Sequence, residues 1–458
     1  MRLRTPLVTE LAVSETALRG LANREPDLFP VFFDSAAQGP LTRYSILGTA
    51  PKASLTRDAR GRLHAKNMDL VPGGFLDNLD AWLKRELPDA PARTSDLPFM
   101  GGWFVYLSYE MAGEIEPRLR LPAASSGNTA FALRVDTMVI QDHVANTAYV
   151  ISADGDGAAH DKLLAAVTQA SRLPAEESEE VPALESLVEE DPGRFLARVD
   201  AAKEYIAAGE IYQANLSRPW HLKVAGARDT QRVYPALRRA NPAPFAARVT
   251  WQGQSIFSSS PERLLQISGR DISTRPIAGT RPRRGTEEQD RADIAELVQH
   301  PKERAEHVML IDLERSDLGR VCEAGTVTVD EYMATESYAH VHHIVSNVRG
   351  RLRADATAVD ALRALFPGGT ITGCPKFRCM QIIAELEGEG RGPYTGSLGW
   401  LGSNGDADFN ILIRTLAVKG THIELRAGAG IVADSDPERE LEETHAKARG
   451  MLRAFGVE

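Results

Sequence analysis

Two apolar runs near the C-terminus, FNILIRTLAV and HIELRAGAGIV, limit the folds open to this chain. They span residues 409–418 and 422–432, and both have the apolar and β-branched content of strands. Parallel neighbours need a crossover of about a dozen residues or more, usually a helix, whereas antiparallel neighbours can be joined by a tight turn. Only a short turn fits between these runs. The pattern therefore predicts an α+β fold with largely antiparallel sheets, and it disfavours a Rossmann fold.

The clearest break in composition is PAEESEEVPALESLVEEDP, residues 174–192, with eight acidic residues, no basic residue and three prolines. Such a stretch is typical of an exposed linker. Residues 1–173 contain short β-rich runs such as GGWFVYLSYE with few helical patterns between them, which predicts a β-rich N-terminal subdomain. Residues 193–458 alternate helical and strand-like patterns and predict a second, larger domain.

The overall charge argues against some classes of partner. The formal net charge is -10 at pH 7 and the pI is near 5.7, so we expect neither nucleic acid nor an anionic membrane as partner. The N-terminus lacks the apolar core of a signal peptide, and no stretch approaches the roughly 18 apolar residues of a membrane span. We expect a cytoplasmic protein in which a small anionic ligand would need a local basic site.

Two predicted helices each carry a pair of glutamates three residues apart: Glu303 and Glu306 in PKERAEHVMLID, and Glu440 and Glu443 in RELEETHAKARG. Lys447 follows one turn later. Each pair shares one helix face, where like charges repel, although a solvated surface helix is the simpler explanation for either pair alone. If the two helices face each other, the four carboxylates need a cation. An oxygen-only set suits Mg²⁺ better than zinc, with some ligands acting through water.

Other positions remain open between a functional and a structural role. The segments RPIAGTRPRRG and FPGGTITGCPKFRCM could present backbone N–H groups to an anion, although the second is also an ordinary helix start. Arg414 interrupts an apolar strand, where its charge needs a partner such as a ligand carboxylate. Glu262 and His343 could each be a general acid or a satisfied polar residue at a strand end.

A set of segments runs along the chain in this order: YQANLSR, SSSPERL, RPIAGTRPRRG, KERAEHVMLIDLERSDLGRV, HHIVSNVRG, FPGGTITGCPKFRCMQIIAELE, YTGSLGWL, IRT and GAGIVADSDPERELEETHAKA. Together these segments resemble the motifs of the chorismate-utilising enzymes. The resemblance covers nearly all of residues 190–458, and extends more loosely to FFDSA, RYSILG and GGWFVYLSYE in the N-terminal half. It implies the family fold, a layered α/β sandwich of two largely antiparallel sheets flanked by helices. Residues 193–458 would form the chorismate-binding domain.

The same resemblance implies a Mg²⁺ ion that binds the ring carboxylate of chorismate. Glu306 and Glu443 match the metal ligands, and Glu303 and Glu440 would support them through water. Gly279–Thr280 would donate backbone hydrogen bonds to the ring carboxylate.

Further positions match family residues that hold the substrate or take part in the reaction. The residues that match positions holding the carboxylates of chorismate are Tyr394, Arg414, Gly430 and Lys447. The first three would hold chiefly the enolpyruvyl carboxylate. Glu262 matches the acid that assists departure of the ring hydroxyl at C4, and His343 matches the active-site histidine. Hydroxide is a poor leaving group, so the chemistry requires a positioned acid and polarisation by the metal.

Gln213 argues against one branch of the family, because isochorismate and salicylate synthases carry a lysine there to activate water. Ammonia is already nucleophilic and does not need that base. Among the ammonia-using branches, YQANLS, GGTITG and YTGSLGWL resemble the para-aminobenzoate branch. Ala278 instead matches the anthranilate branch, since many para-aminobenzoate members have a nucleophilic lysine there. We expect the para-aminobenzoate branch, with the anthranilate branch as the alternative.

The resemblance also implies a separate glutamine amidotransferase subunit that supplies ammonia, because none of the three cysteines lies in a G-x-C-x-G elbow. The segments FFDSA and RYSILG lie where family members carry a tryptophan pocket, but the feedback motif LLES of the anthranilate enzymes is not present. A non-catalytic amino-acid-sensing or scaffold subunit is the competing hypothesis. The acidic pairs, together with Glu262, Arg414 and Lys447, argue against it.

Overall fold

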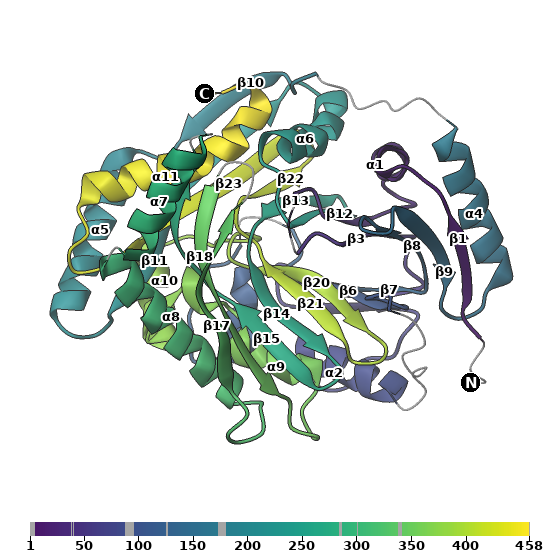
Figure 1. Ribbon diagram of the computed structural model, residues 1–458, viewed down its shortest axis with the longest axis horizontal. Coiled ribbons are helices and arrows are strands. Elements are labelled where there is room, and N and C mark those ends of the chain that lie inside the picture. Colours follow the sequence, from purple (N-terminus) through teal and green to yellow (C-terminus); the bar gives the residue numbers. More distant parts are fainter. Residues whose placement is uncertain are drawn as a thin grey trace.

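The computed structural model describes residues 5–37, 39, 41–87, 96–124, 127–172, 180–283, 286–299, 301–337 and 341–457. Its described strands form two large sheets, and helices lie along their outer faces (Figure 1). Neighbouring strands pair antiparallel in both sheets. The expected α+β fold, a sandwich of two antiparallel sheets flanked by helices, is therefore confirmed.

The first sheet contains 12 of the described strands. In spatial order these are β1 (Leu7–Leu11), β9 (Thr147–Ser152), β8 (Thr137–Asp142), β3 (Tyr44–Gly48), β2 (Val31–Asp34), β12 (Phe245–Trp251), β13 (Gln254–Ser260), β22 (Thr415–Lys419), β23 (His422–Ile431), β11 (Gln213–Val224) and β10 (Leu184–Glu189), with β19 (Gly373–Cys374) also paired to β11.

The second sheet contains 11 of the described strands. In spatial order these are β16 (Ile277–Pro282), β18 (Val341–Arg351), β15 (Asp271–Arg275), β14 (Arg263–Ser268), β21 (Ala407–Ile411), β20 (Ser397–Gly402), β6 (Gly102–Leu107), β7 (Ala130–Val135), β4 (Ala53–Arg57) and β5 (Leu63–Lys66), with β17 (Thr328–Ser337) also paired to β18.

Both sheets take strands from residues 1–173 and from residues 193–458. The two parts of the chain meet where β2 pairs with β12 in one sheet and where β6 pairs with β20 in the other. The N-terminal part also contains helices α1 (Glu15–Arg24), α2 (Phe75–Glu86) and α4 (Gly157–Ser171), more than its sequence pattern predicts. Within the expected linker 174–192, β10 forms an exposed edge strand on β11, whereas residues 173–179 lie outside the described residues.

The helices cover the sheets in two groups. The outer face of the first sheet packs against α1, α4, α6 (Ala227–Ala240) and α11 (Pro437–Leu452), and the outer face of the second packs against α2, α8 (Pro301–Gly319) and α9 (Ala358–Leu365). At one end, α5 (Pro192–Ala207) and α10 (Lys376–Glu387) pack on β11. The remaining described helices are α3 (Ala112–Ile115), α7 (Glu287–Gln299), η2 (Tyr109–Met111), η3 (Gly369–Ile371) and η4 (Arg453–Phe455).

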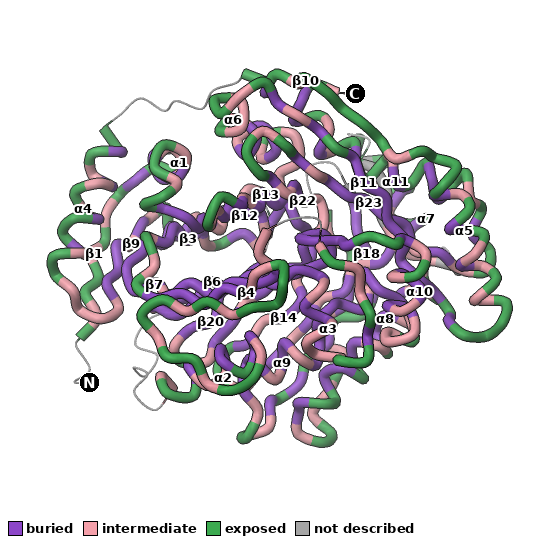
Figure 2. Tube along the Cα trace, turned by 180° about the vertical axis from the view of Figure 1, so that it is seen from behind, coloured by how far each residue is buried: buried purple, intermediate pink, exposed green. Residues whose placement is uncertain are grey.

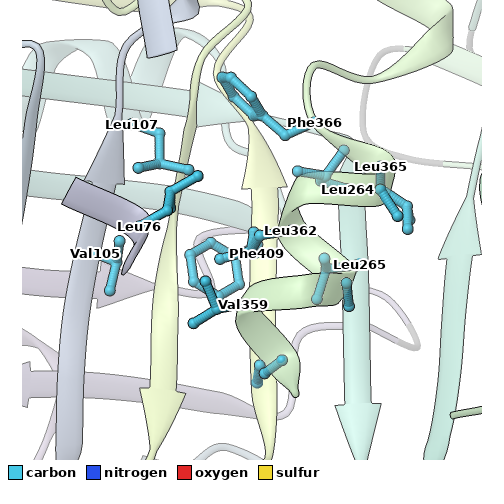
Figure 3. Packing of buried hydrophobic residues seen from close by; sticks show 14 of the residues in the cluster. Leu76, Val105, Leu107, Leu264, Leu265, Val359, Leu362, Leu365, Phe366 and Phe409 are labelled. Carbon is cyan, nitrogen blue, oxygen red and sulfur yellow. The ribbon is translucent and has the colours of Figure 1, made fainter. Parts of the chain in front are cut away.

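Separate apolar cores hold these layers together. Between the sheets, Phe104 and Tyr106 of β6 lie in one buried cluster with Ile140 of β8. On the outer face of the second sheet, Phe409 of β21 packs with Leu362 of α9 (Figure 3). Exposed residues lie mainly on the outer helices and loops (Figure 2). Truncating a fully buried leucine typically costs about 2–5 kcal/mol, so these cores fix the sheets and the segments that join them.

The run FNILIRTLAV is not one strand, and this corrects the sequence prediction. The chain leaves the second sheet at the end of β21 and enters the first sheet at the start of β22. Arg414 lies in the bend between them with a φ of 51°. Apolar content alone cannot reveal this bend, because the run is buried on both sides of it. The predicted antiparallel pairing with the following run is confirmed for β22 and β23.

Candidate active site

Two chain crossings between the sheets lie side by side and position two charged residues. Glu262 lies where the chain passes from β13 in the first sheet to β14 in the second, and Arg414 lies where it passes back from β21 to β22. The Ile411 N–H donates to the Glu262 carbonyl over 3.0 Å, and the Ser259 N–H donates to the Arg414 carbonyl over 3.1 Å. The backbone thus ties one crossing to the other.

A cavity of about 750 Å³ opens beside these crossings. The sequence-predicted site residues that line it are Gln213, Glu262, Gly279, Glu303, Glu306, His343, Tyr394, Arg414, Gly430, Glu440, Glu443 and Lys447. Thr280 pairs with His343 between β16 and β18, and its side chain lies outside the described residues. Residues spread over most of the C-terminal half of the chain therefore meet at one cavity of the size that small-molecule sites have.

The two glutamate pairs face this cavity from α8 and α11. The Gln213 side chain on β11 donates to Glu306 over 2.6 Å, and Lys447 pairs with Glu443 over 2.7 Å. Burial raises the pKa of Glu306. The hydrogen bond from Gln213 opposes this rise, whereas the negative charges of Glu303 and Glu443 add to it. The cavity therefore concentrates negative charge where the glutamates of α8 and α11 line it.

A divalent cation fits this donor set. Oxygen-only donors suit Mg²⁺, and a cation would relieve the repulsion that raises the pKa of Glu306. Within the part of the chain that the structure describes, no three His, Cys, Asp or Glu side chains are already arranged to hold a metal ion. Glu443 is paired with Lys447, which sets a carboxylate and a cation side by side in the cavity lining.

Two glycines allow the carboxylates to approach the strands. A Cβ on Gly430 of β23 would lie 2.4 Å from the Gln213 amide nitrogen, which bonds Glu306. Gly279 has a φ of 70° at an irregularity of β16, and a Cβ there would lie 2.8 Å from a carboxylate oxygen of Glu303. The glycines of GAGIV and PIAGT therefore make room for acidic side chains on α8.

Glu262 is 4% exposed. Burial raises its pKa to about 7, although the Thr370 hydroxyl, the Ile277 N–H and the positive charges of Lys447 and Arg414 all oppose the rise. A carboxyl with a pKa near 7 is about half protonated at neutral pH, whereas an ordinary glutamate is ionised. Glu262 can therefore donate a proton to a group bound in the cavity.

His343 of β18 is 2% exposed and carries no charge at neutral pH. Burial lowers its pKa to about 3, with a further contribution from the nearby positive charge of Arg414, whereas a hydrogen bond with the Gly279 backbone raises it. A neutral imidazole has one donor and one acceptor nitrogen. Its place beside the cavity lets it contact a bound molecule without adding charge.

Basic and aromatic groups also line the cavity. Lys447 donates to the Gly428 carbonyl over 2.9 Å, and its pKa is raised by the Glu443 charge against the effect of burial. A Cβ on Gly428 would lie 2.7 Å from the Tyr394 hydroxyl, so this glycine admits the phenol. The Arg391 guanidinium lies 5.5 Å from the centre of the Tyr394 ring. These groups suit an anionic ligand.

The structure adds Asn215, Thr370 and Gly428 to the residues predicted from the sequence, since all three line the cavity. Asn215 could have been found, because it lies two residues after Gln213 on one strand and so shares its face. Thr370 lies in the turn GGTITG, whose helix-start pattern gave no reason to expect a contact with Glu262.

A second cavity of about 460 Å³ is lined by residues of FFDSA and RYSILG together with Trp400 and the ion pair of Arg263 and Asp408, which are 2.9 Å apart. It lies at the segments whose resemblance to the family suggested the position of a tryptophan pocket. Among the described helices, none is long and apolar enough to cross a lipid bilayer.

The chain belongs to the chorismate-binding enzymes, since the family described as chorismate binding enzyme matches residues 32–453. Its relatives include the anthranilate synthase component I-like protein of Synechocystis, 40% identical over 425 residues and covering 91% of this chain and 83% of that protein. Aminodeoxychorismate synthase component 1 of Bacillus subtilis is 40% identical over 444 residues, and the match covers 93% of this chain and 91% of that protein.

A solved structure, anthranilate synthase component I from Streptococcus pneumoniae TIGR4, superposes with a TM-score of 0.78 and 33% identity. The match covers 90% of this chain and 93% of that one. The fold is therefore that of the chorismate-utilising enzymes. Because relatives named for two different reactions are equally similar, overall identity does not separate those reactions.

We expect Gly430→Ala to abolish turnover of chorismate while the protein stays folded, because the added methyl would push Gln213 away from Glu306. Steady-state kinetics and the Tm measure the two effects. The control is Gly319→Ala at the end of α8, where a Cβ would meet no atom within 4 Å and the activity should not change. Wild-type turnover by Gly430→Ala would show that the Gln213 contact is dispensable.

Proposed function

We propose that this protein is the synthase component of an aminodeoxychorismate synthase, which aminates chorismate to 4-amino-4-deoxychorismate in a Mg²⁺-dependent reaction of the para-aminobenzoate and folate pathway. The observation that carries the proposal is a buried carboxyl with a pKa of about 7, Glu262, in one cavity with Arg414, Lys447 and the carboxylates of α8 and α11. The family membership supplies chorismate as the substrate class.

Chorismate carries two carboxylates, and we assign a set of partners to each. The proposed Mg²⁺ site is formed by Glu306 and Glu443, with Glu303 and Glu440 supporting through water, and it would hold the ring carboxylate and polarise it. The backbone of Gly279–Thr280 would donate to the same group. The proposed partners of the other carboxylate are Tyr394, Arg414, Gly430 and Lys447.

Glu262 would protonate the C4 hydroxyl as it leaves, which removes the need to expel hydroxide. Neutral His343 lies close enough to Arg414 for the positive charge of Arg414 to lower the pKa of the imidazole. We assign His343 a contact with the substrate near Arg414. Gln213 donates its amide to Glu306, so it orients a carboxylate and supplies no base. This agrees with ammonia, and not water, as the nucleophile.

The anthranilate reaction is the second candidate, and Ala278 is the observation that favours it. Ala278 lines the cavity beside Gly279 and offers no side-chain nucleophile. The motifs around Asn215 and Thr372 favour the para-aminobenzoate branch, and Asn215 and Ile371 of these motifs line the cavity. We give the motifs more weight because some of their residues border the site. Ala278 weighs less, because ammonia can attack without a covalent intermediate on a lysine.

We further propose that a separate glutamine amidotransferase subunit delivers the ammonia and that the protein works in the cytoplasm, with neither nucleic acid nor membrane as partner. The net charge of -10 supports the last point. A non-catalytic sensing subunit remains the remote alternative, and the convergence of acidic and basic side chains on one cavity argues against it.

Replacing either proposed metal ligand, Glu306→Gln or Glu443→Gln, should abolish chorismate turnover, because each removes a charge from a hard-cation site. Calorimetric titration should show that these variants also lose Mg²⁺ binding, which is a readout independent of activity. Glu442→Gln, an exposed neighbour on α11, is the matched control and should behave as wild type. Full ammonia-dependent turnover in either ligand variant would refute the metal site.

Glu262→Gln should lower kcat by roughly 10²–10⁴ and leave chorismate affinity nearly unchanged, as expected for loss of a positioned acid. Since the protonated form is the active one, wild-type kcat should fall as pH rises through about 7, and the residual activity of the variant should lack this limb. Weaker binding with kcat preserved would contradict the role of Glu262 as an acid.

The product separates the two candidate reactions. With chorismate, Mg²⁺ and an ammonium salt, and with no downstream lyase, we expect 4-amino-4-deoxychorismate that keeps its enolpyruvyl ether and releases no pyruvate. Mass spectrometry and a coupled pyruvate assay measure both. Stoichiometric pyruvate with fluorescent ortho-aminobenzoate would establish the anthranilate reaction instead.

A further inference from the structure

Helix α11 lines the cavity along most of its length, and the charges that it presents there change sign from one end to the other. Glu440 and Glu443 line the cavity near the start of the helix, whereas Arg449 and Arg453 line it at the end of the helix and in the short turn η4 that follows. At a helical rise of 1.5 Å per residue, roughly 15 Å separates Glu443 from Arg453 along the axis. The two arginines therefore extend the cavity lining beyond the glutamate site.

The arginine end of the cavity is exposed to solvent. Its wall is formed by the end of α11 together with the segment that follows α6 and begins at Asn241. These two elements approach closely, since a Cβ on Gly450 would lie 3.3 Å from the Asn241 side chain. Arg449 and Arg453 are both exposed, whereas Glu262 inside the cavity is almost fully buried. The cavity therefore meets solvent at the end where the arginines lie.

The two arginine side chains make no hydrogen bond or ion pair with any other described residue. The other described cations of the cavity lining are already engaged. Lys447 pairs with Glu443 over 2.7 Å, and the buried Arg426 pairs with Glu389 over 3.0 Å. Arg414 lies near the buried acid at the neighbouring chain crossing. The open end of the cavity thus carries two positive charges that no described carboxylate neutralises.

These charges are not explained by the stability of the helix. Basic residues near a helix C-terminus interact favourably with the helix dipole, but that interaction does not require them to line a cavity. Arg449 and Arg453 are also one helical turn apart, where like charges repel. Two unpaired cations at this spacing suit a ligand that carries more than one negative charge.

A dianionic substrate needs such a route into this protein. Chorismate carries two carboxylates, whereas the chain has a formal net charge of -10, so the average field around the molecule disfavours its approach. Charges of one sign that line a cleft with low-dielectric walls focus the field and raise the rate at which a ligand of opposite charge associates. The two arginines provide a local positive field at the open end of an otherwise acidic molecule.

We propose that Arg449 and Arg453 form the entrance through which chorismate reaches the site, and that their charges speed its association. The dianion is drawn to the open end of the cavity and then moves along α11 toward Lys447. This inference rests on chorismate as the substrate, which the proposed function shares with the anthranilate alternative. It does not depend on which ring carbon is aminated.

The test is the double variant Arg449→Gln, Arg453→Gln, which keeps polar side chains at the entrance and removes both charges. Stopped-flow tryptophan fluorescence follows the association of chorismate with Mg²⁺ present and ammonia absent. At an ionic strength of about 0.01 M, where charges act over about 30 Å, we expect an association rate constant about 3- to 10-fold below that of the wild type. Near 1 M, where this length is about 3 Å, the difference should vanish.

Two further double variants separate the entrance from net charge and from side-chain shape. Arg449→Lys, Arg453→Lys keeps both charges and should associate at the wild-type rate. Arg24→Gln, Arg60→Gln removes the same total charge from exposed positions outside the cavity lining and should leave the rate nearly unchanged. Equal slowing by the two glutamine double variants would show that net charge alone acts, which would refute the entrance.

An unchanged association rate in Arg449→Gln, Arg453→Gln at low ionic strength would also overturn the proposal. If this double variant does not fold, each single glutamine variant should show a smaller reduction, and no reduction in either would have the same meaning. Calorimetric Kd values at the two ionic strengths serve where binding does not change the fluorescence, and the double variant should then bind more weakly only at low salt.

These binding measurements do not require turnover. A wild-type protein that does not bind chorismate would defeat the proposed function, whereas chorismate binding that ignores Arg449 and Arg453 would defeat only this inference.

Discussion

The passage of the chain between two packed sheets is the constraint on which the site depends. Packed sheets lie about 10 Å apart, so a chain that leaves one for the other must bend sharply and give up its strand pairing at that point. Here it does so at Glu262 and again at Arg414, and the two bends share backbone hydrogen bonds through Ile411 and Ser259. An acid and a guanidinium are thereby fixed beside each other on rigid elements, with the apolar cores on either side holding the geometry.

Burial then gives these groups unusual properties. Glu262 is shielded from water, so its pKa rises to about 7 even with Arg414 and Lys447 nearby. His343 is shielded to the same degree and loses its charge. Lys447 faces the open cavity and keeps its charge through Glu443. One cavity therefore holds an acid that is about half protonated, a neutral imidazole and charged cations at the same pH, which a solvent-exposed cluster of these side chains could not do.

Much of this arrangement could be predicted from the sequence, and the failures have physical causes. The spacing of Glu440 and Glu443 placed both on one face of α11, because helix periodicity is local. The bend at Arg414 could not be seen, because both strands it joins are buried and apolar. The strand β10 looked like a linker because its exposed edge position permits acidic residues.

Ala278 shows why the fold alone does not decide between the two ammonia-using reactions. Its side chain ends at Cβ on a strand irregularity that also carries Gly279, so it lines the cavity without reaching into it. A lysine at the same position would bring a nucleophile and another positive charge to this cavity. Under the proposed function, the ring carbon that ammonia attacks would then depend on how Tyr394 and Arg414 orient the bound substrate. That orientation is a property of side chains, and two enzymes with the same backbone can differ in it.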